Sequence, residues 1–301
     1  MKRYFRTSFL VCGLLLVLTQ LRAQDDRYDA GYLRLTREYT LNPDGSMDYR
    51  FTKQQKLLSY RAFQSLYGET FIAYNPAVQK LKINEVYTTM ADGKKISAPA
   101  NSFNEVLPGF AAGAPSFNGL REMVITHTGL ERNATINLDY QIHTEKGIFP
   151  ALMGNELLSE AEPVKSLVIT IRIPAGQDLF YKVFNGNYIP EEKTDGTFRI
   201  YTWKIEDLAA NSNEEAQQGI NDRYPRLIFS TSGKREEVYS FLTNQAAFGF
   251  ATTEQMQGAV NGWLADKKER FEKVLKLQEK VVNDLRLYPV SLKASLYRCR
   301  T

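Results

Sequence analysis

Short segments in which apolar and polar residues alternate dominate the first two thirds of the chain. Between residues 135 and 143, Ile136, Leu138, Tyr140 and Ile142 alternate with more polar neighbours, which is the period of a half-buried β-strand. Comparable segments, separated by turn residues, predict strands at 32–40, 46–52, 81–88, 122–127, 135–143, 164–173, 179–184 and 197–205. Many short strands and few helices predict a mostly β protein with an antiparallel β-sandwich.

The pattern changes to a helical period after about residue 230. Residues 234–248 have helical spacing, and Thr252 with Gln255 forms a capping-box pair at the start of a longer helical stretch. That stretch carries a broad apolar stripe among lysines and glutamates and ends at Pro289. We expect either a pair of helices or one kinked helix, and the unsustained heptad pattern disfavours a coiled coil.

These two patterns divide the chain into a β domain at residues 24–232 and a helical segment at residues 233–301. Within the β domain, residues 101–119 are rich in proline, glycine, alanine and asparagine, and predict a long loop. This loop is either functional or an ordered cover over one end of the sandwich.

The first 23 residues have the features of a secretory signal peptide. Basic Lys2, Arg3 and Arg6 precede an apolar run, and Ala23 provides a small residue for cleavage. The run is shorter than the roughly 20 residues of a membrane-spanning helix, and Cys12 lies too early in it for lipoprotein processing. We therefore expect cleavage near Ala23, export to the periplasm or cell envelope, and no membrane span.

Charge and side-chain content exclude several classes of function. Four of the 38 basic residues lie in the signal segment, so the mature chain, with 34 acidic residues, has a net charge near zero. Such a chain lacks the basic footprint of a nucleic-acid-binding protein. Cys299 is the one remaining thiol, and His127 and His143 are the two histidines, which leaves too few ligands for a zinc or haem site. We expect no cofactor and no metal.

The sequence carries no clear catalytic group. Cys299 is the obvious nucleophile, but both histidines lie more than 150 residues upstream, so no base can be assigned to it. His127 follows a predicted strand and is interpreted as a structural histidine. A further hypothesis makes it the general base of a hydrolase.

Four residues near strand ends are candidates for contact with a substrate or partner. They are Arg121, Glu122, His127 and Glu131. Buried charges need partners, so an arginine–glutamate pair that braces the loop is one interpretation of this group. A patch that contacts a peptide or glycan is the other.

Several segments together resemble a bacterial domain of unknown function that precedes transglutaminase-like domains in envelope proteins. The resemblance is carried by residues 70–79, 81–96, 120–131 and 135–143, and by Tyr201-Thr202-Trp203 with Ile205. None of these motifs has a catalytic role in that family. They resemble turn and strand markers, so the resemblance implies an immunoglobulin-like β-sandwich followed by a C-terminal helical segment. Residues 252–301 resemble the opening of the transglutaminase-like, papain-type domain without its cysteine nucleophile, histidine and aspartate, so the resemblance assigns no catalytic residue.

The resemblance implies a non-catalytic module of a secreted transglutaminase- or cysteine-protease-like envelope protein, which positions a substrate or scaffolds the catalytic domain. Its implied partner is its own downstream transglutaminase-like domain, with a protein, peptide or glycan as ligand. We expect the chain to be a fragment of a longer protein, because an exposed apolar stripe promotes aggregation. The alternative is a stand-alone extracytoplasmic adhesion or carbohydrate-binding module, for which Trp203 and Trp263 are the only tryptophans available for sugar stacking.

Overall fold

The structure is a computed structural model that describes residues 28–211, 223–245, 252–284 and Leu296. The expected signal peptide, Pro289 and Cys299 lie outside the described residues. The chain divides into two units, and each is described by itself. The first contains residues 1–106 and 121–233, and the second contains residues 107–120 and 234–301.

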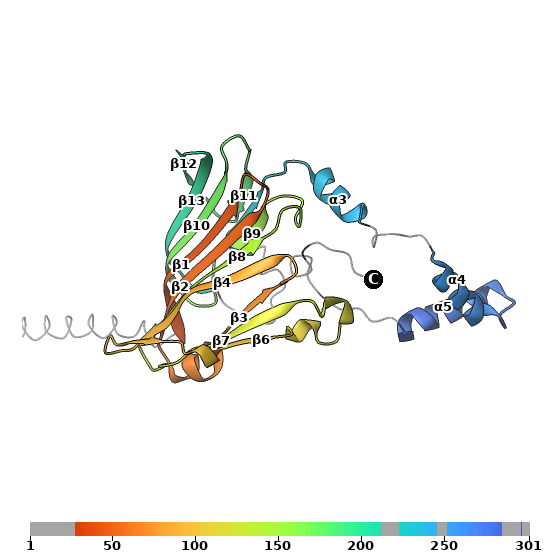
Figure 1. Ribbon diagram of the computed structural model, residues 1–301, viewed down its shortest axis with the longest axis horizontal. Coiled ribbons are helices and arrows are strands. Elements are labelled where there is room, and N and C mark those ends of the chain that lie inside the picture. Colours follow the sequence, from red (N-terminus) through yellow and green to blue (C-terminus); the bar gives the residue numbers. More distant parts are fainter. Residues whose placement is uncertain (1–27, 212–222, 246–251, 285–295, 297–301) are drawn as a thin grey trace, which may run out of the picture. The chain divides into compact units, whose positions relative to one another are not determined.

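A large eight-stranded sheet forms the framework of the first unit, and Figure 1 shows most of its strands side by side. The strands follow the order β12-β13-β10-β1-β2-β8-β4-β5. Their bounds are β1 Ala30–Leu41, β2 Met47–Leu57, β4 Gln79–Thr89, β5 Lys95–Ser97, β8 Thr135–Thr144, β10 Val164–Pro174, β12 Glu191–Asp195 and β13 Phe198–Leu208.

Neighbouring strands of this sheet are antiparallel except β1 and β10, which are parallel. The sheet is thus antiparallel as predicted, with one parallel pair that the sequence did not indicate. A tight turn forces β1 and β2 to be antiparallel, whereas β10 returns to β1 only after more than 100 intervening residues and is free to run in the same direction.

Two three-stranded antiparallel sheets complete the β structure. One has the order β3-β7-β6, with bounds Glu69–Tyr74, Arg121–Thr126 and Phe103–Val106. The other has the order β11-β14-β9, with bounds Phe180–Phe184, Arg226–Ser230 and Met153–Leu157. Strand β6 lies inside the segment for which the sequence predicted a long loop, and a 3-10 turn at Ala100–Ser102 precedes it.

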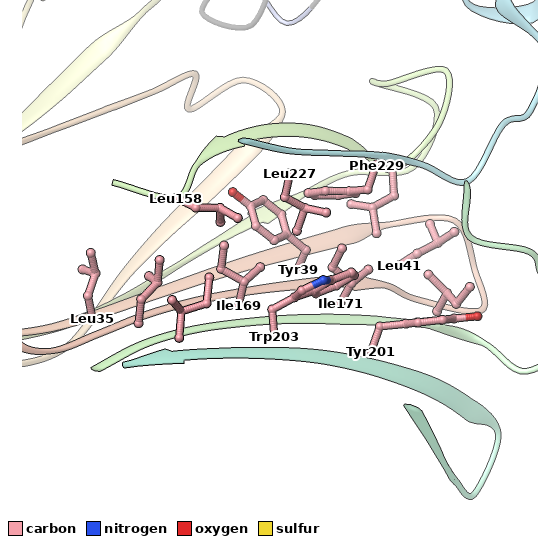
Figure 2. Close-up of a cluster of buried hydrophobic side chains, with 14 of the residues drawn as sticks. Leu35, Tyr39, Leu41, Leu158, Ile169, Ile171, Tyr201, Trp203, Leu227 and Phe229 are labelled. Carbon is pink, nitrogen blue, oxygen red and sulfur yellow. The ribbon is translucent and has the colours of Figure 1, made fainter. Parts of the chain in front are cut away.

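Both small sheets pack on the same face of the large one. The larger core joins β1, β10 and β13 to β14, with Trp203, Leu227 and Phe229 at its centre (Figure 2). A second cluster joins Ile72 of β3 and Ile125 of β7 to Leu138 of β8. Phe51 of β2 packs against both clusters. The mostly β, sandwich-like architecture is confirmed, while the immunoglobulin-like connectivity stays a prediction.

In the part of the chain that the structure describes, the second unit contains short turns and three helices. The 3-10 turns are Gly109–Ala111 and Pro115–Phe117, and the helices are α3 Arg235–Thr243, α4 Glu254–Leu264 and α5 Arg270–Asp284. The long helical stretch is thus a pair of helices, α4 and α5.

The N-cap of α4 is one residue later than the sequence predicted. The side chain of Thr253, and not of Thr252, accepts a hydrogen bond from the backbone N–H of Met256 at 3.1 Å. A threonine serves as an N-cap where its hydroxyl can reach the N–H three residues on, and neighbouring threonines make this choice ambiguous in sequence. Among the residues described, no helix has the length and apolar character needed to cross a membrane.

Candidate functional site

Strand β7 positions the four residues that the sequence singled out, but it does not gather them. Arg121 and Glu122 open the strand, His127 follows its end, and Glu131 lies in the next loop. Six residues of extended chain span roughly 20 Å, so Arg121 and His127 lie at opposite ends of the strand. The four residues therefore do not form a single site.

At the start of β7, Arg121 braces the small sheet. Its Nε lies 3.6 Å from Oε1 of Glu105 on β6, and the hydroxyl of Tyr74 on β3 donates to the other oxygen of Glu105. Burial and this hydrogen bond raise the pKa of the Tyr74 hydroxyl to about 12. Arg121 is thus part of an arginine–glutamate brace, and its glutamate is Glu105. Glu122 pairs with Ala73 and Val106 in the ladder.

Glu131 anchors a neighbouring turn. Its Oε1 accepts a hydrogen bond from the backbone N–H of Ala91 at 2.8 Å, in the turn that joins β4 to β5. Gly129, two residues earlier, has a φ of 72° and lies against Ile96, where an added Cβ would come within 3.0 Å of the side chain. These contacts give the segment after β7 a defined path.

His127 is buried and neutral. Its backbone N–H donates to the carbonyl of Gly68 at 2.9 Å, and its Nε2 lies 2.8 Å from Oγ1 of Thr70. Burial, with a smaller contribution from the charge of Lys53, lowers the pKa of His127 to about 4. A general base works best with a pKa near the operating pH and with access to its substrate, and this side chain, 6% exposed, has neither.

His127 belongs to a cluster that we call the buried polar layer, which consists of Lys53, Gln55, Thr70 and His127. Nζ of Lys53 lies 3.1 Å from Oε1 of Gln55 and 3.4 Å from Oγ1 of Thr70. Burial lowers the pKa of Lys53 to about 8. Side-chain atoms of two members, Nε2 of Gln55 and Nδ1 of His127, are buried without a hydrogen-bond partner, as is Oγ1 of the next residue in the chain, Thr128.

The buried polar layer interrupts an apolar row on the inner face of β2. Alternate residues of a strand share a face, so Phe51, Lys53, Gln55 and Leu57 follow one another there. Phe51 packs in one apolar cluster and Leu57 in another. The sequence contains a signal for this layer, because the residues at alternate positions of β2 are apolar or aromatic up to Phe51 and polar at the next two positions. The predicted strand, however, stopped at residue 52.

A second buried group of charges ties β1 to the region of β9. Arg37 lies 3.1 Å from Oε2 of Glu156 and also pairs with Glu160, while the hydroxyl of Tyr39 donates to Oε1 of Glu156 at 2.6 Å. Burial acts to lower the pKa of Arg37, but the carboxylates of Glu160 and Glu156 outweigh it and raise the pKa. Burial, together with the Glu156 carboxylate, raises the pKa of Tyr39. All these groups have structural partners, so we assign the cluster a bracing role.

The described part of the chain holds no group of three or more histidine, cysteine, aspartate or glutamate side chains that could bind a metal ion. His143, the other histidine, lies with its Nδ1 2.9 Å from Oδ1 of Asp48 on the half-exposed side of β2 and β8. The two histidines thus lie in separate environments, one on each face of the large sheet.

Residues 43–212 match the model of DUF3857, a domain of unknown function with a solved structure. This confirms the expected kind of domain. A crystal structure of a candidate protease from Parabacteroides distasonis is similar at a TM-score of 0.80 and 34% sequence identity, over 89% of this chain and 53% of that one. The chain thus spans about half the length of this relative.

Two M1 zinc metallopeptidase structures also match. One is from Deinococcus radiodurans, and the other is a two-domain enzyme bound to L-tryptophan. Each is 9% identical over 68% of this chain and 43% of that one, with TM-scores of 0.31 and 0.33. Similarity this low carries no argument about fold or function. No curated protein matches the sequence.

Proposed function

The chain belongs to the family of proteins that contain the DUF3857 domain, and from this premise we propose that it is the non-catalytic, substrate-positioning or scaffolding module of a secreted transglutaminase- or cysteine-protease-like envelope protein. The observation that carries the proposal is its similarity to the candidate protease, of which it spans 53%. The catalytic residues of such a protein would then lie in the part that this chain does not span.

The chemistry of the described residues supports a non-catalytic role. The two most plausible acid–base groups, His127 and Lys53, are buried, and the pKa of His127 is too low for a base that works near neutral pH. Arg121 braces a sheet and Glu131 anchors a turn, and both are partly buried. These residues are placed to make the module rigid, which is what a positioning role requires.

The apolar face of α5 supports a docking role for the second unit. Five apolar side chains of this helix are exposed: Phe271, Val274, Leu275, Val281 and Val282. The opposite face carries lysines, and Nζ of Lys280 lies 5.7 Å from the ring centre of Trp263 on α4. A contiguous exposed apolar face marks an interaction surface. We propose that the remaining part of the transglutaminase-like domain covers it.

Export is part of the same proposal. The segment that ends near Ala23 has the features of a cleaved signal, and the module would act in the periplasm or at the cell envelope. N-terminal sequencing of the protein purified from its native host tests this point. A mature N-terminus close to Gln24 is expected, and an intact Met1 would contradict it.

The functional test uses the complete product of the native gene, as wild type and with Val282→Glu or Asn283→Glu. The two substitutions add the same charge at adjacent exposed positions, but only Val282 belongs to the apolar face. Hydrolysis and transamidation of envelope-type peptides are measured as kcat/KM. Burying a charge at an apolar interface is costly, so Val282→Glu is expected to lower kcat/KM at least tenfold while Asn283→Glu leaves it unchanged.

Two results would overturn the proposal. Equal activity in both variants would show that the apolar face of α5 does not contact the catalytic part. A native product that lacks hydrolase and transamidase activity but gives a clear signal on a glycan array would instead support the adhesion or carbohydrate-binding module.

A further inference from the structure

The buried polar layer lies between two strands of the small β3-β7-β6 sheet and the inner face of the large sheet, and its side chains are incompletely partnered. We propose that it binds a small monovalent inorganic anion of the size of chloride, held by Lys53, Gln55 and His127. The site is independent of the function proposed above, because it lies wholly within the β unit and uses none of the docking residues of α5.

The positive charge of Lys53 has no negatively charged partner among the described residues. Its Nζ contacts two neutral oxygens, those of Gln55 and Thr70, and within the described ranges no carboxylate lies within ion-pair distance of it. Lys53 is 9% exposed and Gln55 is fully buried. With a pKa of about 8 the amine still carries its proton at pH 7. A buried charge is stabilised only when an opposite charge accompanies it.

Lys53 fixes the direction of two hydrogen bonds in the layer. A lysine amine can only donate, so the oxygens of Gln55 and Thr70 accept from Lys53. The Thr70 hydroxyl has one proton and two lone pairs, so it can donate to Nε2 of His127 or accept from it. When it donates to Nε2, the proton of the neutral imidazole lies on Nδ1.

Unpartnered atoms of the layer can donate to a ligand. Nε2 of Gln55 carries two hydrogens, and Nδ1 of His127 carries one when Thr70 donates to Nε2. Gln55 contacts Lys53 directly, and an unpartnered donor beside a positive charge complements an anion. A cation or a carbonyl-rich ligand would leave Lys53 unbalanced.

Burial of the layer limits the size of a ligand that it can hold. The unpartnered atoms of Gln55, His127 and Thr128 are shielded from solvent, and apolar Phe51 and Leu57 border the layer along β2. A ligand must leave its water to enter, and a peptide carboxylate would need an opening for the rest of its chain. A compact monovalent anion meets both conditions, since its single charge makes dehydration least costly.

The direct test is crystallography of the mature protein grown in sodium bromide, with data collected at the bromine absorption edge. An anomalous peak in contact with Nζ of Lys53 is expected. The Lys53→Met variant keeps a side chain of similar length without the charge, and no peak is expected there. Ordered density without anomalous signal in the wild type would identify water and overturn the proposal.

A solution test uses the melting temperature in sodium chloride and in sodium gluconate at equal ionic strength, because gluconate is too large to enter. A ligand that binds only the folded state raises Tm, and saturating chloride is expected to raise it by roughly 5 °C. The exposed Lys80→Met control should keep this difference, and Lys53→Met should lose it. If Lys53→Met does not fold, the bromide experiment on the wild type decides. Equal Tm values for the wild type in both salts would overturn the proposal.

Discussion

The neutral state of His127 makes the β unit sensitive to mild acid. In the folded protein its pKa is about 4, against an ordinary value of 6.5. Between these values the unfolded chain binds a proton that the folded chain does not, and protons then favour unfolding. The contribution of His127 to stability is therefore complete above pH 6.5 and is lost as the pH falls towards 4.

The size of the effect follows from the two pKa values. The whole difference is equivalent to about 3 kcal/mol, and about 2 kcal/mol of it is lost between pH 7.5 and pH 5. Most carboxylates stay ionised at pH 5, so they contribute little to the change over this range. Because domains are stable by only about 5–15 kcal/mol, a loss of 2 kcal/mol is easily measured.

The assay is urea unfolding at pH 7.5 and 5.0 in a gluconate buffer, which keeps the buried polar layer free of halide. Wild type is compared with His127→Gln, whose side chain keeps hydrogen-bonding groups but does not titrate. The wild type is expected to lose about 2 kcal/mol more than this variant on acidification. Equal losses in wild type and His127→Gln would refute the reasoning.

Two further predictions concern packing and buried charge. Gly154→Ala is expected to destabilise the protein by about 1–3 kcal/mol, because the new Cβ would lie 2.3 Å from the ring of Phe229. In urea unfolding, the double variant Gly154→Ala/Phe229→Leu should lose less stability than the sum of the losses of the two single variants. Strictly additive losses would contradict a steric clash as the cause. Glu156→Gln is expected to cost roughly 3 kcal/mol, since it removes one carboxylate from the buried guanidinium of Arg37. Glu191→Gln, in an exposed ion pair, should leave the urea midpoint unchanged, and equal losses at the two glutamates would show that burial does not control the effect.

The alternation of residues was sufficient to place the long strands, because it reflects burial of one face. Ile136 and Leu138 lie inward on β8 as predicted, and the four inward residues from Leu167 to Ile173 are fully buried on β10. The helical period of apolar residues likewise placed the helices in the last quarter of the chain. The brace at Arg121 was among the interpretations, but its partner Glu105 lay in a segment taken for a loop.

Short strands were missed where their stability comes from pairing with distant segments. Strands β3, β6, β9 and β14 have four to six residues each, too few for a clear period. The parallel pairing of β1 with β10 was missed for the same reason, since nothing in either strand specifies which neighbour it will have.

The sequence by itself determined which residues face inward, where the chain changes from strands to helices, and to which family the β unit belongs. Only the tertiary structure decided that Lys53, Thr70 and His127 meet, because they come from three segments of the chain and contribute to one buried layer. Local periodicity records whether a side chain is buried, whereas its charge state depends on which distant groups are buried beside it. The electrostatic character of His127 and Lys53 is therefore a property of the fold.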